Sequence, residues 1–136
     1  MRKLFKKKEI FKVKSLPVDP AGMGEPKTVD DFQKRGMAYY ARKQFKDAEA
    51  DLKKAVSMNE NNIDAYYSLG MVLKAANQND EAVAAFNHVI NIITTKNEAN
   101  AWGTKYDMLR RLALGHVNEM TQGDWNLEKE IWKHIE

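Results

Sequence analysis

An internal repeat of 34 residues constrains this sequence more than any other feature. When the chain is shifted by 34 positions against itself, large residues align with large residues and small with small. The aligned pairs are Phe32 with Tyr66, Gly36 with Gly70, Tyr39 with Leu73, Asp47 with Glu81, Ala48 with Ala82, Leu52 with Phe86, and Ala55 with Val89. A self-similar period of this length is typical of stacked helix hairpins. Two antiparallel helices approach closely only where one offers Gly or Ala to a bulky residue of the other, and the Gly36/Ala48 and Gly70/Ala82 pairs provide such contacts.

This pattern resembles the tetratricopeptide repeat family, in which an aromatic residue, Leu-Gly, Tyr, Ala, Phe and Pro recur at fixed spacing. The second copy matches with Tyr66, Leu69, Gly70, Leu73, Ala82 and Phe86, and the first with Phe32, Gly36, Tyr39, Ala48 and Leu52. The first copy departs at Arg35, and neither copy has the closing proline, since Glu60 and Thr94 stand there. The resemblance implies an all-α fold, a right-handed α-solenoid of antiparallel helix pairs, with units at 28–61 and 62–95.

Local signals locate the ends of these helices. Thr28 followed by Asp31 predicts a capping box, and Lys43–Gln44 predicts a break between the two helices of the first unit. Further helix starts are predicted at Asn61–Asn62, at Asn79–Asp80 and at Asn97.

Residues 96–136 follow the pattern less closely. They contain two apolar helical stripes, separated by a break at Gly123: Trp102, Tyr106, Leu109, Leu112 and Ala113, then Leu127, Ile131, Trp132 and Ile135. Because solenoids need about three units and end in atypical ones, this segment is interpreted as a degenerate third unit that caps the stack. A separate binding helix is the alternative.

The N-terminal part differs in composition from the repeats. Residues 1–14 hold seven basic residues against Glu9 alone, a local charge of +6, so that the rest of the chain carries −3 of the total of +3. These basic residues are Arg2, Lys3, Lys6, Lys7, Lys8, Lys12 and Lys14. Residues 15–27 contain all three prolines and predict a linker. The sequence therefore predicts a basic arm at 1–14, a linker at 15–27 and the repeats from Thr28.

Nothing in the sequence indicates catalysis, a metal or a cofactor. The chain has no cysteine, which removes disulfides, thiolate zinc sites and a thiol nucleophile. Its three histidines, His88, His116 and His134, are scattered without partners at ligand spacing, and Gly22-Met23-Gly24 follows no strand. We therefore expect a non-enzymatic protein without a small-molecule substrate.

The resemblance also implies where a partner protein would bind. In this family the first helix of each pair lines a concave groove, and the corresponding positions are Gln33, Met37, Tyr40 and Ala41, then Asp64, Tyr67, Met71, Lys74 and Ala75. The family's clamp for acidic chaperone C-termini needs Lys and Asn where this chain has Gln33, Met37 and Ser68. We thus expect an apolar or amphipathic peptide or helix as ligand. The alternative is that these residues pack on the chain's own third unit or on its N-terminal arm.

The basic arm has three interpretations: a solubilising tail, a contact for anionic lipid, or a contact for nucleic acid or an acidic protein. Its apolar residues, Leu4, Phe5, Ile10, Phe11 and Val13, scatter around a helical wheel and give little amphipathic signal. No stretch has the length of a membrane span, and no apolar run follows the basic residues as in a signal peptide. The leading prediction is a cytoplasmic adaptor or scaffold, and the alternative is a peripheral membrane- or nucleic-acid-associated assembly factor held by its arm.

Overall fold

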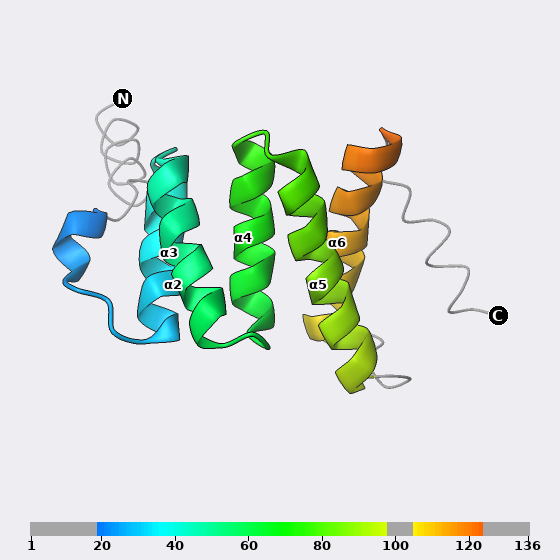
Figure 1. Ribbon diagram of the computed structural model, residues 1–136, viewed down its shortest axis with the longest axis horizontal. Coiled ribbons are helices and arrows are strands. Elements are labelled where there is room, and N and C mark those ends of the chain that lie inside the picture. Colours follow the sequence, from blue (N-terminus) through cyan, green and yellow to red (C-terminus); the bar gives the residue numbers. More distant parts are fainter. Residues whose placement is uncertain (1–18, 98–104, 124–136) are drawn as a thin grey trace, which may run out of the picture.

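The computed structural model describes residues 19–97 and 105–123, and this part of the chain is helical without strands. A short 3-10 helix, η1 (Pro20–Met23), precedes five α-helices. These are α2 (Val29–Ala41), α3 (Phe45–Met58), α4 (Ile63–Ala75), α5 (Asn79–Asn97) and α6 (Lys105–Gln122). They stand side by side along the long axis of the molecule and alternate in direction (Figure 1). Each contacts its neighbour in the chain, so the predicted all-α solenoid of helix pairs is confirmed.

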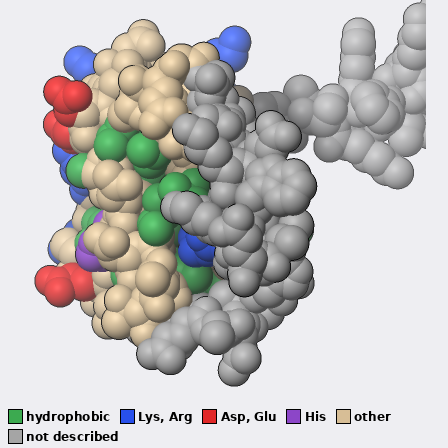
Figure 2. Space-filling model, turned by 90° about the vertical axis from the view of Figure 1, so that its right-hand side faces the viewer, with side chains coloured by type: hydrophobic (Ala, Val, Ile, Leu, Met, Phe, Trp, Pro, Cys, Tyr) green, Lys and Arg blue, Asp and Glu red, His purple; other side chains and the backbone are tan. Residues whose placement is uncertain are grey.

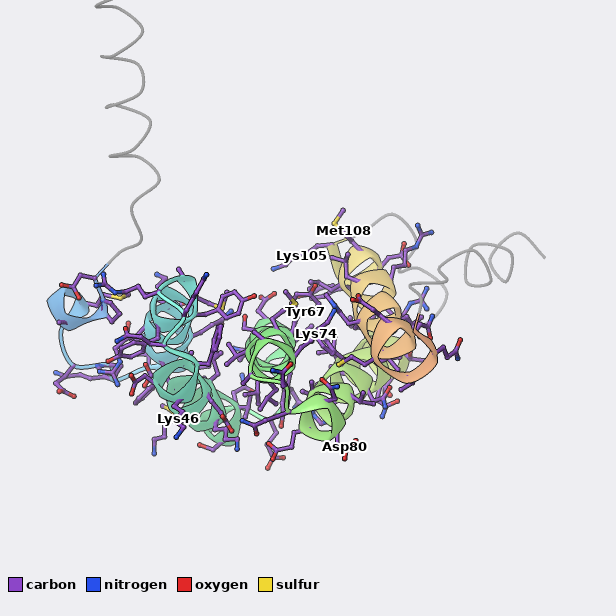
Figure 3. All side chains as sticks on the ribbon, turned by 90° about the horizontal axis from the view of Figure 1, so that it is seen from above. Lys46, Tyr67, Lys74, Asp80, Lys105 and Met108 are labelled. Atoms are coloured by element: carbon purple, nitrogen blue, oxygen red, sulfur yellow. The ribbon has the colours of Figure 1, made fainter. Side chains whose placement is uncertain are left out.

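The helices form two layers. Seen from above, α2, α4 and α6 lie on one side of the molecule, and α3 and α5 on the other (Figure 3). The core fills the space between the layers. Its largest fully buried side chains are Leu52, Val72, Leu73, Phe86, Val89 and Ile93. Gly36 of α2 faces Leu52 of α3, and Gly70 of α4 faces Phe86 of α5, so the same close approach occurs once in each unit.

The predicted helix starts at Thr28 and Asn62 are confirmed. Thr28 Oγ1 accepts a hydrogen bond from the Asp31 amide at 3.1 Å, and the Asp31 carboxylate accepts from the Thr28 amide at 3.2 Å. A second backbone amide, that of Lys27, also donates to this carboxylate, and these two amides lower the pKa of Asp31. Asn62 caps α4 by accepting from the Ala65 amide at 2.9 Å.

Two predicted starts need correction. Asn79 is the first residue of α5 instead of its cap. The prediction that Asn97 caps a fifth helix was wrong, because α5 continues to Asn97 and the next described helix begins at Lys105. The buried Ile92 and Ile93 extend the apolar stripe of α5 by a further turn, which stabilises the longer helix.

The turns within the two units have one geometry. Lys43 and Asn77, which are 34 residues apart, adopt φ of 61° and 62°. In each turn the next amide reaches back to a carbonyl five residues earlier, Gln44 to Tyr39 and Gln78 to Leu73, both at 2.9 Å. This is the Schellman arrangement that closes helix C-termini. The predicted break at Lys43–Gln44 is thus confirmed, and so is the break at Gly123, which has φ of 81°.

The departure of the first unit at Arg35 has a structural explanation. The Arg35 guanidinium donates two hydrogen bonds to the Asp51 carboxylate, at 2.7 and 2.8 Å. This bond raises the pKa of Arg35 further, so the guanidinium is charged. In the second unit the equivalent positions hold Leu69 and Ala85, which are both buried. A bidentate ion pair therefore replaces an apolar pair between the two helices of the first unit.

Part of the predicted linker packs on the first unit. Asp19 caps η1 by accepting a hydrogen bond from the Ala21 amide, and Pro20 is buried. This short helix contacts α2. The basic arm at 1–14 and the stripe from Leu127 to Ile135 lie outside the described residues, as does Trp102.

Candidate functional site

The candidate site is the surface formed by α2 and α4, the first helices of the two units, together with α6. In Figure 3, Tyr67 and Lys74 project from α4 toward α6, and Lys105 and Met108 of α6 lie on the same side of the molecule. Lys46 and Asp80 lie on the opposite side. We call the side of α2, α4 and α6 that carries Met37, Tyr67, Lys74 and Met108 the concave surface.

The predicted residues of the second unit contact α6. The Tyr67 hydroxyl lies 3.2 Å from Nε2 of His116, and the Lys74 ammonium lies 2.9 Å from its Nδ1. Because an ammonium only donates, Nδ1 accepts, and Nε2–H donates to the Tyr67 oxygen. Lys74 also pairs with Glu119 at 2.9 Å. The imidazole is therefore held neutral between two helices.

His116 is buried, with 8 % of its surface exposed. Its ring stacks on Phe86, with centroids 4.7 Å apart and planes at 12°, while Tyr67 meets Phe86 edge-on at 5.5 Å. Burial, and then the nearby Lys74 charge, lower the pKa of His116. Burial likewise raises the pKa of the Tyr67 hydroxyl. This cluster of Tyr67, Lys74, Phe86, His116 and Glu119, the His116 cluster, joins α6 to the second unit.

A further ion pair joins the same helices at their other end, between Lys105 and Asp64 at 3.2 Å. Met71 is half-buried against the core. Three predicted groove residues of the second unit, Asp64, Tyr67 and Lys74, thus contact α6, which lies in the segment predicted to be a third unit. Packing on that segment is one of the arrangements that the sequence left open. Their role toward a partner stays a prediction.

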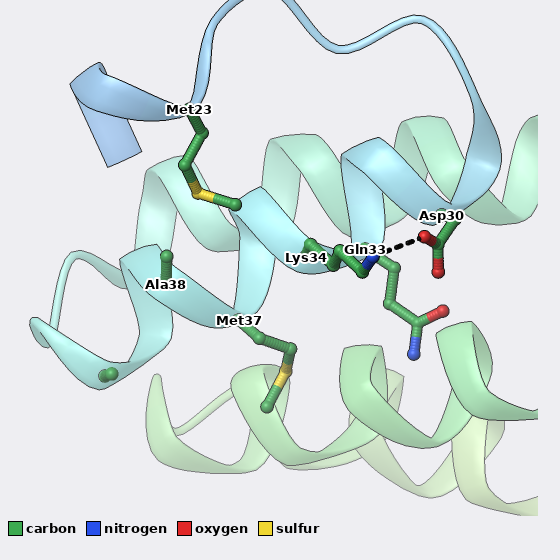
Figure 4. A pocket seen from close by; sticks show the side chains of 7 residues that line it. Met23, Asp30, Gln33, Lys34, Met37 and Ala38 are labelled. Carbon is green, nitrogen blue, oxygen red and sulfur yellow. Dashed lines mark ion pairs between the residues drawn. The ribbon is translucent and has the colours of Figure 1, made fainter. Parts of the chain in front are cut away.

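The predicted residues of the first unit lie differently. Gln33 and Met37 line a groove beside α2, of about 590 Å³, together with Met23, Asp30, Lys34, Ala38 and Ala41 (Figure 4). Tyr40 is half-buried, and its ring packs against that of Phe45 with centroids 5.9 Å apart. The two units therefore do not present one continuous row of free side chains.

Sequence reasoning missed three residues of this surface: Lys105, Met108 and His116. The sequence contained a signal for Lys105 and Met108. Lys105 lies 34 positions after Met71, which lies 34 positions after Met37, and Met108 follows Lys74 and Tyr40 in the same way. The side chain of Met108 is 63 % exposed. Figure 2 views the molecule from the α6 end, where hydrophobic side chains of the described residues form a strip down the middle of the face.

Within residues 19–97 and 105–123 there is no group of three or more His, Asp or Glu residues arranged to hold a metal ion. None of the described helices has both the length and the apolar character needed to cross a membrane.

Comparison with known proteins agrees with the repeat geometry. The model of the tetratricopeptide repeat family matches residues 39–101, a span that includes the whole of α3, α4 and α5. Residues 39–101 form a tetratricopeptide repeat region. Repeats of this family generally mediate protein–protein interactions and are generally non-catalytic. Neither the curated proteins nor the solved structures compared with this chain gave a match.

Proposed function

We propose that this chain is a non-catalytic adaptor whose concave surface binds a peptide or a helix of a partner protein. The observation that carries the proposal is a set of half-buried or exposed Met and Tyr side chains on the first helices of three successive units: Met37 and Tyr40 on α2, Met71 on α4 and Met108 on α6. Such side chains offer apolar area and adaptable shape to a partner.

The charges of the concave surface support an apolar or amphipathic partner over a strongly charged one. Asp64 pairs with Lys105, and Lys74 pairs with Glu119. Charges already paired within the chain contribute little to the recognition of an ionic ligand, since that ligand would have to displace an existing partner. Ser68, at one of the family's chaperone-clamp positions, is buried. These features favour binding through Met and Tyr contacts.

Affinity purification with mass spectrometry tests this proposal when three forms of the chain are compared. The double variant Met71→Glu/Met108→Glu places two charges on the concave surface. Met58→Glu is the matched control, because Met58 is 44 % exposed at the end of α3, a helix of the other layer. We expect the proteins captured by the intact chain to be retained by Met58→Glu and lost by the double variant.

Equal capture by the double variant and the control would show that the concave surface does not bind the partner. Circular dichroism of both variants is recorded first, so that a loss of fold is distinguished from a loss of binding.

A cytoplasmic location is part of this proposal, as is an additional contact of the basic arm with an anionic membrane or nucleic acid. Replacing Lys6, Lys7 and Lys8 with Gln separates the two contacts. Arm binding is electrostatic and weakens steeply with added salt, whereas binding through Met and Tyr does not. If the triple variant binds anionic vesicles and oligonucleotides as the intact chain does, the arm has no such role.

A further inference from the structure

The N-terminal edge of the solenoid carries a groove between η1 and α2. Its apolar lining comes from Met23, Met37, Ala38 and Ala41. Figure 4 shows Met23 reaching from η1 over α2, with Met37 and Ala38 below it. The ion pair of Lys34 with Asp30, at 2.9 Å, lies along the rim. An apolar trough with a charged rim is suited to an apolar segment of chain that keeps its charges in solvent.

Comparison of the two repeat units shows which packing contact is absent at this groove. Ala38 of α2 corresponds to Val72 of α4, which is completely buried, and both helices of the first unit, α2 and α3, contact α4. No earlier unit precedes α2 among the described residues; η1, with four residues, contacts it instead. The groove therefore lies where the packing of a preceding unit is missing.

We propose that the N-terminal segment of this chain, residues 1–18, docks in this groove through its apolar side chains. The segment joins η1 directly at Asp19, and the next residue, Pro20, is buried. Met23, the last residue of the same short helix, lines the groove. The apolar residues available for docking are Leu4, Phe5, Ile10, Phe11, Val13, Leu16 and Val18.

Length and tethering favour this occupant. Eighteen residues span up to about 60 Å when extended, and α2 with its 13 residues is about 20 Å long, so the segment reaches every part of the groove. A short tether also gives the segment an effective concentration of the order of millimolar.

Charge also favours the chain's own segment over a second copy. Asp19 and Glu25 are exposed at and just after η1. They attract the seven basic residues of the segment, whereas a second copy would bring an identical groove and a second basic arm of like charge. Since Gln33 and Met37 belong both to this groove and to the predicted partner surface, a docked segment covers the first-unit edge of that surface.

The experiment uses the full chain, which has no native cysteine and therefore takes a single spin label cleanly. A nitroxide is attached at Ala41→Cys, an exposed position that lines the groove, or at the control position Ser57→Cys, exposed on α3. Backbone amide signals of residues 4–13 are then compared with the reduced label. We expect these signals to be lost with the label at Ala41→Cys and retained with the label at Ser57→Cys.

A second comparison tests the apolar contacts. Phe5→Asp/Phe11→Asp lies outside the repeats, so the described fold is retained, and we expect the lost signals to return. Retained signals in the chain labelled at Ala41→Cys, or lost signals that do not return in the double variant, overturn the proposal. A mixture of isotope-labelled chain with separate spin-labelled chain identifies the occupant: signal loss in the mixture means a second copy and also overturns it. None of these results depends on whether the concave surface binds a partner.

Discussion

Two glycines set the distance between the paired helices. A Cβ atom at Gly70 would lie 2.8 Å from both Cε1 and Cζ of Phe86, and one at Gly36 would lie 2.8 Å from Cγ of Leu52. Both facing side chains are completely buried, so neither can move aside without disturbing the core. The sequence predicted a close approach of the helices at Gly36 and Gly70, because small residues recur there, but it named Ala48 and Ala82 as their partners instead of Leu52 and Phe86.

Gly70→Ala is expected to destabilise the fold. The helix gains about 1 kcal/mol from the better propensity of Ala, but overpacking against a rigid ring costs about 1–3 kcal/mol, and the Phe86 ring has no space to retreat. Urea unfolding followed by circular dichroism measures the difference. Gly22→Ala is the control, since nothing lies within 4 Å of a Cβ there. A Gly70→Ala chain as stable as the natural one would show that the helices can move apart.

The Arg35–Asp51 ion pair is the residue-level departure that the repeat pattern did not explain. The side chain of Asp51 is 7 % exposed and that of Arg35 is 23 % exposed, so removal of the arginine leaves a carboxylate with little access to water. The family pattern supplied no partner for Arg35, because Asp51 lies 16 positions later at a site where the second unit has Ala85.

A double-mutant cycle measures this pair. Arg35→Leu alone is expected to cost about 3–5 kcal/mol, because it leaves the buried charge uncompensated. Arg35→Leu/Asp51→Ala reproduces the apolar pair of the second unit and is expected to recover most of that loss. Urea midpoints of the four chains give the coupling free energy. A double variant as unstable as Arg35→Leu would mean that the ion pair is not what the arginine contributes.

At the scale of elements, the sequence located helix starts better than helix ends. Thr28 and Asn62 carry side chains that satisfy backbone amides, and this signal is local. The end of α5 depends instead on the burial of Ile92 and Ile93, which is a property of the packed core. A cap residue at Asn97 therefore misled the prediction, since the helix continued through it.

The turn at Lys43 offers an element-scale prediction. A residue with φ near +60° costs about 1–2 kcal/mol for most L-amino acids, less for Asn, and almost nothing for Gly. Lys43→Gly is therefore expected to stabilise the chain by about 1 kcal/mol, and Asn77→Gly, at the equivalent turn, by clearly less. Thermal and urea unfolding of both variants compare the turns. An equal gain at both positions would contradict this account of the strain.

At the scale of the whole molecule, the units form a linear stack in which each helix pair contacts only what lies beside it. The last of these contacts joins α6 to the second unit, and the His116 cluster supplies its polar side chains. No sequence signal indicated this cluster, because Tyr67 and His116 are 49 positions apart and their contact is outside the repeat pattern. The groove beside α2 was equally hidden, since it depends on where η1 packs.

Stability is expected to depend on pH through His116. Its pKa is lowered in the folded chain, so the unfolded chain binds more protons as the pH falls below about 6.5. The stabilisation is complete above that pH and is lost as the pH falls through the lower pKa of the folded state. Urea midpoints between about pH 5 and pH 8 report this slope.

His116→Gln should flatten the slope, because it removes the buried imidazole. A slope that survives in His116→Gln would assign the effect to another group.

A solenoid is an open assembly, because each end repeats the kind of surface that its interior units bury. Copies of such a chain can stack head to tail without limit, and the result is a fibre. Arg35 lies on α2, the first α-helix of the stack, beside the segment Met23–Pro26 that precedes this helix. Its ion pair with Asp51 places charge at positions where the second unit has Leu69 and Ala85. An approaching copy would have to strip water from that charge without offering a partner in return. The departure at Arg35 is thus expected to oppose the stacking of further copies on this end of the solenoid.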